Sequence, residues 1–354
     1  MTVHYIAFDV HCAFTEVAVV SASGRVVKRL RVATKIPDLT AVVDGVRGTR
    51  WLTFEEGSLA GWLYRHLRDR VDKLIVCDPR RNHLVAKDSD KDDPIDAEKL
   101  AQLLRGKYLK PVHQTDSLER AIFKQHVGVY HDSVRDRVRA SNLILAHFRR
   151  FGVFSSEAEM TDAENRPTLL RRLPPSRVLR EDIELLWRSY DTLLEQAETM
   201  RLRLEREARR IPTIRQFTEV PGIRWIRAAT FFAYIDTPWR FSSKSALWKY
   251  VGIGLERTHS GNGPTRVRVA QYANRRLRNV LLGAAQTAIK VGDNPFFDQY
   301  QRWTQEGGIS ARNARRNVAR SLAATLWGMW KNGSPYRPQL VAAGGKIADT
   351  LASS

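Results

Sequence analysis

The sequence predicts an α/β domain at the N-terminal end of the chain, followed by regions made mainly of helices. Two observations lead to this prediction. Short apolar segments that resemble strands alternate with amphipathic helical segments as far as Arg105, which is typical of an α/β layered domain. Beyond Ser117 the apolar residues recur at the spacing of long helices. We therefore expect a first domain over residues 1–116.

The elements of this first domain are predicted in the following order. Residues 5–9, 14–20 and 26–32 form a β-meander, with a Ser-Ala-Ser-Gly turn between the second and third strands. A helix at 39–46, a strand at 50–54, a helix at 59–70 and a strand at 73–77 come next. A helix over 93–105 completes the domain, and Asp93 and Pro94 suit its N-cap and first helical positions.

Residues 117–210 are predicted to form two long helices. Seven apolar residues in the second helix alternate steps of three and four, which is the pattern of a coiled-coil seam and also of a short amphipathic helix in a bundle. They are Ile183, Leu186, Tyr190, Leu193, Ala197, Met200 and Leu204. Residues 155–175, between the helices, are polar and contain prolines, which predicts a loop or a hinge.

A mainly helical C-terminal domain is expected over residues 211–337. Its Val220-Pro-Gly-Ile223 segment precedes an apolar helix at 225–235 and has the shape of a helix-hairpin-helix turn, whose backbone amides hold a phosphate. An ordinary turn is the alternative interpretation. The small and polar residues 338–354 predict a mobile tail.

The charge of the chain points to a polyanionic partner. The 354 residues carry a formal net charge of +20, while 43% hydrophobic residues and 9 Trp supply enough apolar surface for folded cores. Residues 211–354 contain 21 Lys and Arg against 7 Asp and Glu, so most of the excess lies there. Nucleic acid is the first candidate.

Other classes of protein are less consistent with the sequence. The chain has no apolar run of about 20 residues and no signal-peptide pattern, so we expect a cytoplasmic protein without a membrane partner. Cys12 and Cys77 lack the spacing of a disulfide framework or of a zinc site.

Four carboxylates follow apolar segments or open a helix. Asp9 ends the first strand, and Glu55, with Glu56 beside it, follows the strand at 50–54. Asp93 and Asp96 lie one helical turn apart at the start of the helix over 93–105. Each residue alone also fits a cap or a solvated turn. Together they match the oxygen ligands of Mg²⁺, two ions of which can clamp the attacking and leaving oxygens of a phosphodiester.

A second group surrounds a serine in a glycine-rich loop. His259-Ser260-Gly261-Asn-Gly-Pro264 can expose Ser260 to a substrate, although most such loops are only turns. Arginines that follow can stabilise charge on a phosphorus atom. They are Arg266, Arg268, Arg275, Arg276 and Arg278.

A third group occupies one helical face without interleaved acids, which favours phosphate binding over a solvated face. It consists of Arg312, Arg315, Arg316 and Arg320.

These motifs resemble the DEDD insertion-sequence transposases of the IS-one-ten type, a bacterial family of recombinases guided by a bridge RNA. The resemblance rests on Ile6 to His11, on Phe54-Glu-Glu-Gly57, on Lys91 to Ala97, and on the segments from Val220 to Arg278. His11 stands where a lysine is frequent, and Glu56 and Asp92 compete with Glu55 and Asp93 for the family's acidic positions.

The resemblance implies a fold and a chemistry. It implies an RNase H-like or RuvC-like catalytic domain with Asp9, Glu55, Asp93 and Asp96 as ligands of Mg²⁺ or Mn²⁺, a helical coiled-coil insertion, and Ser260 as nucleophile. The expected partners are donor DNA, target DNA, a bridge RNA and further copies of the chain in a dimer or tetramer. Two alternatives remain at this point: a RuvC-like structure-specific nuclease that uses water, and a nucleic-acid-binding protein without catalysis.

Overall fold

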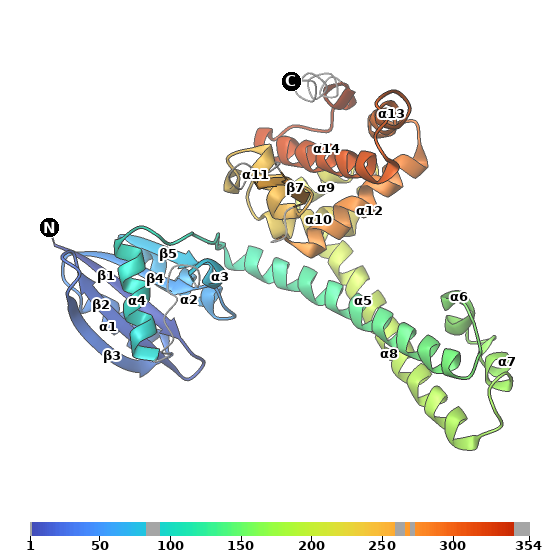
Figure 1. Cartoon of the computed structure of the whole chain (residues 1–354), viewed down its shortest axis with the longest axis horizontal. Coiled ribbons are helices and arrows are strands. Elements are labelled where there is room, and N and C mark those ends of the chain that lie inside the picture. Colours follow the sequence, from blue (N-terminus) through green and yellow to red (C-terminus); the bar gives the residue numbers. More distant parts are fainter. Residues whose placement is uncertain (1, 83–92, 259–265, 270–272, 343–354) are drawn as a thin grey trace. The chain divides into compact units, whose positions relative to one another are not determined.

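The computed structural model describes residues 2–82, 93–258, 266–269 and 273–342 (Figure 1). Contacts within the chain divide it into two compact units, Met1–Ala121 and Ile122–Ser354. The separation of residues 117–210 from residues 211–337 stays a prediction. No helix in the described part of the chain is both long and apolar enough to cross a bilayer.

The first unit is built on a five-stranded mixed sheet in the order β3-β2-β1-β4-β5. Strands β1 (Val3–Val10), β2 (Phe14–Ser21) and β3 (Val26–Ala33) form the predicted antiparallel meander. Strands β4 (Thr49–Glu55) and β5 (Lys73–Cys77) continue the sheet in parallel on the other side of β1. This mixed sheet is consistent with the expected RNase H-like fold.

Helices cover both faces of the sheet because the strand side chains alternate between them. Ile6 and Phe8 of β1 pack with helices α1 (Ile36–Asp44) and α2 (Ala60–Leu67). Ala7 lies on the opposite face and packs with helix α4 (Asp93–Arg105), which crosses that face in Figure 1. The short helices η1 (Arg68–Arg70) and α3 (Pro79–Asn82) flank β5.

The second unit begins with two long antiparallel helices, α5 (Leu118–Arg150) and α8 (Arg177–Arg209), which lie side by side in Figure 1. At their tip the rings of Phe148 and Trp187 are 5.7 Å apart between centroids. At the other end Val127 and Leu204 belong to one buried cluster. All seven residues of the predicted apolar seam are buried or half-buried.

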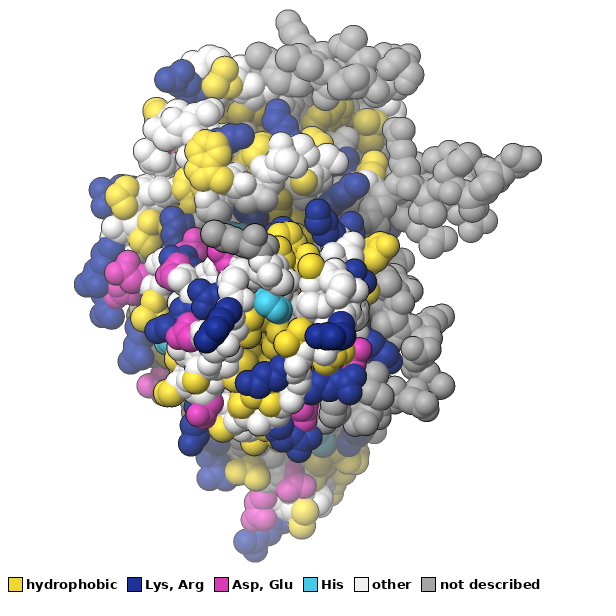
Figure 2. Space-filling view, turned by 90° about the vertical axis from the view of Figure 1, so that its left-hand side faces the viewer, with side chains coloured by type: hydrophobic (Ala, Val, Ile, Leu, Met, Phe, Trp, Pro, Cys, Tyr) yellow, Lys and Arg dark blue, Asp and Glu magenta, His cyan; other side chains and the backbone are white. Residues whose placement is uncertain are grey.

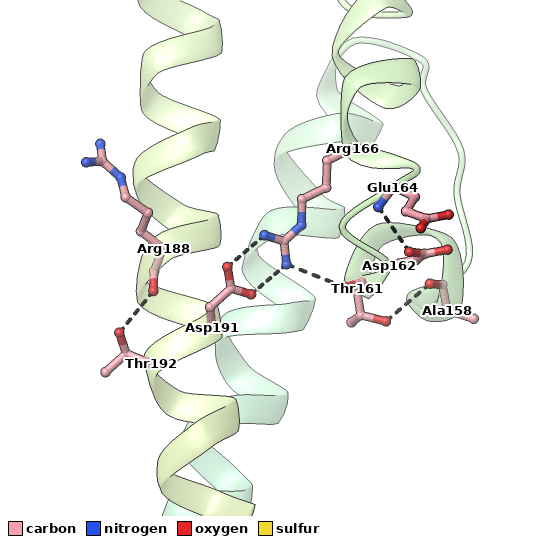
Figure 3. A network of polar contacts seen from close by, with 8 residues as sticks. All are labelled: Ala158, Thr161, Asp162, Glu164, Arg166, Arg188, Asp191 and Thr192. Atoms are coloured by element: carbon pink, nitrogen blue, oxygen red, sulfur yellow. Dashed lines mark hydrogen bonds and ion pairs between the residues drawn. The ribbon is translucent and has the colours of Figure 1, made fainter.

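The tip of this helical hairpin differs from the loop or hinge predicted for residues 155–175. It contains two short helices, α6 (Glu157–Thr161) and α7 (Arg166–Arg171). A capping box between Ser156 and Glu159 starts α6. Arg166 donates two hydrogen bonds of 2.7 and 2.6 Å to the carboxylate of Asp191 on α8 (Figure 3). The prediction was wrong because local capping and a distant ion pair order this polar segment.

The remaining helices of the second unit surround one large core. They are α9 (Pro212–Phe217), α10 (Trp225–Ile235), η2 (Pro238–Arg240), α11 (Lys244–Val251), α12 (Arg275–Val291), α13 (Pro295–Gln301), η3 (Arg302–Glu306) and α14 (Ala311–Asn332). The buried residues of α10 lie against α12 and α14. Val341, within the segment predicted to be a mobile tail, is buried in this core, and residues 343–354 lie outside the described residues.

Strands β6 (Leu255–Thr258) and β7 (Arg266–Val269) form an antiparallel hairpin between α11 and α12. Thr258 pairs with Arg266, so residues 259–265 connect the two strands. The predicted nucleophile Ser260 and its neighbour His259 are in this connection and lie outside the described residues.

Candidate functional site

Asp9 and Glu55 are brought to the same edge of the sheet by the pairing of β1 with β4. These strands are parallel, and Phe8 lies opposite Phe54 in their register. Asp9 and Glu55 are the next residues on each strand. Because Phe8 and Phe54 both belong to the core under α1 and α2, strand alternation places Asp9 and Glu55 on the other face, which α4 covers.

The N-terminal end of α4 approaches this same edge. Its last turns lie near the β2–β3 turn, where Gln102 Nε2 donates a hydrogen bond of 2.7 Å to the carbonyl of Gly24. That turn is at the end of β1 opposite to Asp9, because Ser21 pairs with His4. Helix α4 therefore runs antiparallel to β1, and its first turn points toward Asp9.

Asp93 and Asp96 lie in that first turn. Asp96 precedes the buried residue Leu100 by four positions, so it lies one turn earlier on the sheet-facing side of the helix. The side chain of Asp96 is exposed, and that of Asp93 is outside the described side chains. Asp9 and Glu55 thus lie at the edge of the sheet toward which the first turn of α4 runs.

The described neighbours of Asp9 are polar. His11 Nε2 lies 3.1 Å from Asp9 Oδ2, and the Asp9 side chain is 29% exposed. Glu16, opposite Asp9 on β2, is buried and forms an ion pair with Arg31. Among the described side chains, which include those of Asp9, Glu55 and Asp96 but not that of Asp93, no three His, Cys, Asp or Glu lie together as a metal-binding group.

The alternative acidic residues are placed differently. Glu56 follows the last residue of β4, and its backbone N–H donates a hydrogen bond of 2.8 Å to the carbonyl of Cys77. Strand alternation therefore favours Glu55 over Glu56 for the face under α4. Asp92 lies outside the described residues.

The base of the β6–β7 hairpin lies next to the end of α11, the start of α12 and the middle of α14. Arg320 of α14 donates a hydrogen bond of 2.7 Å from Nε to the carbonyl of Ile253, two residues before β6. At the other end, the backbone N–H of Asn274 donates to the carbonyl of Tyr250 at 2.9 Å, and the Asn274 side chain caps α12. The hairpin that carries Ser260 therefore starts and ends beside the arginine helices.

Several arginines gather around this base. The pKa of Arg316 is lowered by burial and by the positive charges of Arg312, Arg278 and Arg315. Burial also lowers the pKa of Arg320, and the charge of Arg316 adds to this effect. Two separate helices thus supply one crowded group of guanidinium ions, which a bound anion would stabilise.

The partners of these arginines in the described part of the chain are neutral oxygens. Arg315 Nη1 donates to Gln286 at 3.0 Å, and Arg316 Nη1 donates to Asn313 at 3.3 Å. Arg320 also donates to the amide oxygen of Asn317. We call the set formed by Arg278, Arg312, Arg315, Arg316 and Arg320 the arginine cluster.

Arg276 has a different role in the structure. Its guanidinium donates a hydrogen bond of 2.6 Å to the hydroxyl of Tyr234 and forms an ion pair with Asp132. Burial acts to lower the pKa of Arg276, but the hydrogen bond with Tyr234 and the charge of Asp132 raise it overall. Arg276, predicted to bind nucleic acid, thus connects α12 to α10 and α5. Arg275 is exposed beside it, whereas the side chains of Arg266 and Arg268 are outside the described ones.

His131, which the sequence patterns did not indicate, adjoins this contact. Its Nε2 lies 2.9 Å from the hydroxyl of Thr230, which itself donates to the carbonyl of Ile226. Burial lowers the pKa of His131 to about 4, with a further contribution from the charge of Arg276 that Asp132 opposes. His131 is therefore neutral at pH 7 and donates from Nε2.

The wider surface has the charge expected for a protein that binds a polyanion. Figure 2 shows Lys and Arg side chains spread over one face of the molecule, with fewer Asp and Glu side chains among them. This distribution agrees with the net charge of +20.

Two segments of the chain match models of known protein families. Residues 6–152 match a model of DEDD transposases of the IS110 type, described as "Transposase". Residues 214–301 match the "Transposase IS116/IS110/IS902 family". Together the two segments span more than half of the chain. A comparison with curated proteins gave no match.

Proposed function

The chain belongs to the IS110 family of transposases, and from this premise we propose that it cuts and rejoins DNA strands with Ser260 as the nucleophile. DNA recombination as such follows from the family. The nucleophile, the metal ligands and the guide RNA are the proposal. The observation that carries it is the parallel register of β1 and β4, which directs Asp9 and Glu55 to the edge that α4 reaches with its first turn.

The acidic residues at this edge fit a divalent cation. Asp9 and Glu55 share one face, and Asp93 and Asp96 open the helix that covers it, so the donor set consists of carboxylate oxygens, as Mg²⁺ or Mn²⁺ requires. Such an ion would supply charge neutralisation at the phosphate and would favour the ionised form of an attacking hydroxyl. Asp9, Glu55, Asp93 and Asp96 would hold it and fix its position.

Ser260 and the arginine cluster provide the other half of the chemistry. In the proposed step the Ser260 oxygen forms a bond to a DNA phosphorus, while the bond from that phosphorus to a deoxyribose oxygen breaks. The hydroxyl loses its proton, and the departing sugar oxygen gains one, so no further reactant is needed. The arginine cluster stabilises the added negative charge on phosphorus. Attack of a different strand end on the phosphoserine bond reverses the step and joins the strands.

Recognition and assembly complete the proposal. A bridge RNA pairs with the donor and target DNA, so the protein contributes phosphate and shape recognition. The hairpin of α5 and α8 acts as a coiled-coil element in a dimer or tetramer, and the turn at Val220–Ile223 acts as a helix-hairpin-helix-like element. Gly222 of this turn adopts a φ of +81° and lies against Ala284 of α12, where a Cβ atom would meet a carbonyl oxygen at 2.3 Å.

Replacement of Ser260 tests the proposal. The variant Ser260→Ala should bind RNA and DNA as the wild type does but make no strand break, because only the attacking atom is lost. Ser260→Cys should retain slight activity. Exposed Ser242→Ala, in the same unit, is the matched control and should cleave normally.

The decisive measurement uses labelled DNA that contains the flanking sequence, stopped in mid-reaction and separated on a denaturing gel. A protein-linked band that disappears on proteolysis, with its mass on the peptide containing Ser260, supports the proposal. Full cleavage by Ser260→Ala without protein-linked DNA overturns it and leaves water as the nucleophile. Sequencing of RNA that copurifies with the chain, expressed beside its flanking DNA, tests the guide.

A further inference from the structure

A cavity of about 630 Å³ lies in the second unit, between α11, α13, α14 and the segment after α14. Its volume is within the roughly 300–1,000 Å³ of small-ligand sites. The floor is formed by small residues of α14, among them Ala324 and Gly328, and Trp248 and Trp327 also line it. The cavity is separate from the acidic edge of the sheet, which belongs to the other unit.

The charged residues of the cavity are all positive. Lys244, Lys331 and Arg337 line it, and no Asp or Glu does so among the described residues. The ammonium of Lys331 lies 5.0 Å from the ring centroid of Trp327 and 5.3 Å from that of Trp239. Trp239 is 68% exposed but is not among the residues that line the cavity. Cationic and aromatic groups thus occur together at this site.

A buried glutamine, Gln299, also lines the cavity. Gln299 is only 3% exposed, and its Nε2 donates to the carbonyl of Val341 at 2.9 Å. This bond fixes the orientation of the amide, and Oε1 has no hydrogen-bond partner in the described part of the chain. A buried acceptor without a partner is costly, so a ligand that supplies an N–H group would stabilise it.

We propose that this cavity binds an unpaired nucleotide of a single-stranded nucleic acid. A nucleotide combines a planar ring that stacks on Trp, an N–H donor for Gln299 Oε1, and a phosphate that Lys244, Lys331 and Arg337 neutralise. A fatty or neutral ligand would leave the three cations unpaired, and an acidic peptide would lack the planar ring. The site goes beyond the proposed recombination, because it provides a place for a base that is outside any duplex.

Gly328 offers a direct way to fill the cavity. A Cβ atom at this position would meet nothing within 4 Å, and replacement of a helical glycine favours the helix. Gly328→Leu should therefore fold and occupy the ligand space, while Gly328→Ala adds only one methyl group and is the control that leaves most of this space open. Ala324→Leu fills the same floor from the preceding turn and serves as a second variant.

The experiment measures the binding of the full chain to a labelled octanucleotide as single-stranded DNA, as single-stranded RNA of the same sequence, as a duplex, and with one abasic position. Gly328→Leu should weaken binding of the single strands about tenfold, as expected for the loss of one stacked base, and leave duplex binding unchanged. The abasic strand should bind the wild type and Gly328→Leu equally. The DNA and RNA arms show which strand the site prefers.

Charge variants and a free nucleotide complete the test. Lys244→Gln with Lys331→Gln should weaken single-strand binding more than the exposed Lys290→Gln does. The proposal is overturned if Gly328→Leu and Ala324→Leu both bind single strands as tightly as the wild type does. It is also overturned if Gly328→Leu weakens the binding of abasic and complete strands equally. Binding of free mononucleotides alone, with no effect of Gly328→Leu on strands, also overturns it. Cleavage by Ser260 is measured separately, so failure of either proposal is recognised by itself.

Discussion

At the scale of single residues, backbone register decides which acidic residues share a face of the sheet. Asp9 and Glu55 are ordinary strand-end carboxylates in the sequence, and each resembles a turn cap. The pairing of Phe8 with Phe54 places them on adjacent strands and on one face. This arrangement leads to the first prediction.

Asp9→Ala and Asp96→Ala should each abolish metal-dependent strand cleavage without loss of folding. Loss of a residue that forms a hydrogen bond to a metal ligand lowers metal affinity or activity about 10–100-fold. Loss of a ligand itself should therefore lower the cleavage rate more than about 100-fold. Neither side chain is in a core, and removal of one negative charge relieves repulsion between the others. Cleavage assays with Mg²⁺ and thermal melting of the same samples measure both effects. Glu56→Ala is the control and should cleave normally. Normal cleavage by Asp9→Ala would show that Asp9 has only a structural role.

A second prediction at this scale concerns His131. Burial and the charge of Arg276 lower its pKa from 6.5 to about 4, against the effect of Asp132. Between these values the unfolded chain binds more protons than the folded chain, so the free energy of unfolding rises with pH. His131→Gln does not titrate and should flatten that rise.

Denaturant unfolding of the wild type and His131→Gln over this pH range provides the measurement. The difference between the two proteins should change up to about pH 6.5 and be constant above about pH 7. A difference that is independent of pH throughout would mean that His131 is protonated equally in both states.

At the scale of elements, the sequence predicted most of what its local patterns can determine. The five strands of the first unit and the helices α4 and α10 occur within a few residues of their predicted bounds, and the apolar seam at 183–204 falls within α8, whereas strands β6 and β7 were not predicted. Helices α6 and α7 were missed because segments of five and six residues are too short to show a periodic signal. The contact of Asp132 with Arg276 was also missed, since 144 residues separate them in the sequence.

The helical hairpin yields the third prediction. Trp187 of α8 is buried against Phe148 of α5, so Trp187→Ala should lower the free energy of unfolding by about 3–5 kcal/mol. Leu185→Ala removes an exposed side chain of the same helix and should change it by less than about 0.5 kcal/mol. Denaturant titrations followed by circular dichroism compare the two. Equal effects would mean that α5 and α8 do not pack as described.

At the scale of the whole molecule, the effect of the net charge of +20 depends on where the charged residues lie and on what they contact. The arginine cluster draws on α12 and α14, and its members bind neutral oxygens within the described part of the chain. Exposed Arg177 and Arg206 of α8, in contrast, pair with Glu181 and Glu207 of the same helix. Among the described residues the arginine cluster has no carboxylate partner, so it is better able to neutralise phosphates than these two arginines.

Replacement of Arg315 and Arg316 by Gln should weaken binding to duplex DNA and flatten its dependence on salt. Each lost phosphate contact lowers the slope of log K against log salt concentration by about 0.9, and both together by about 1.8. The matched control replaces Arg177 and Arg206, which pair with Glu181 and Glu207. Fluorescence anisotropy over a salt series gives the slopes, and an equal slope for cluster variant and wild type would assign these arginines to a solvated face.

The two long helices of the hairpin are equal in length. Helices α5 and α8 contain 33 residues each, which corresponds to about 50 Å at roughly 1.5 Å per residue and to about 15 base pairs of DNA at roughly 3.4 Å each. The ion pair between Arg166 and Asp191 joins α7 to α8 at the tip, and α5 and α8 run side by side from there. The reach of the hairpin therefore changes only when both helices are lengthened or shortened together.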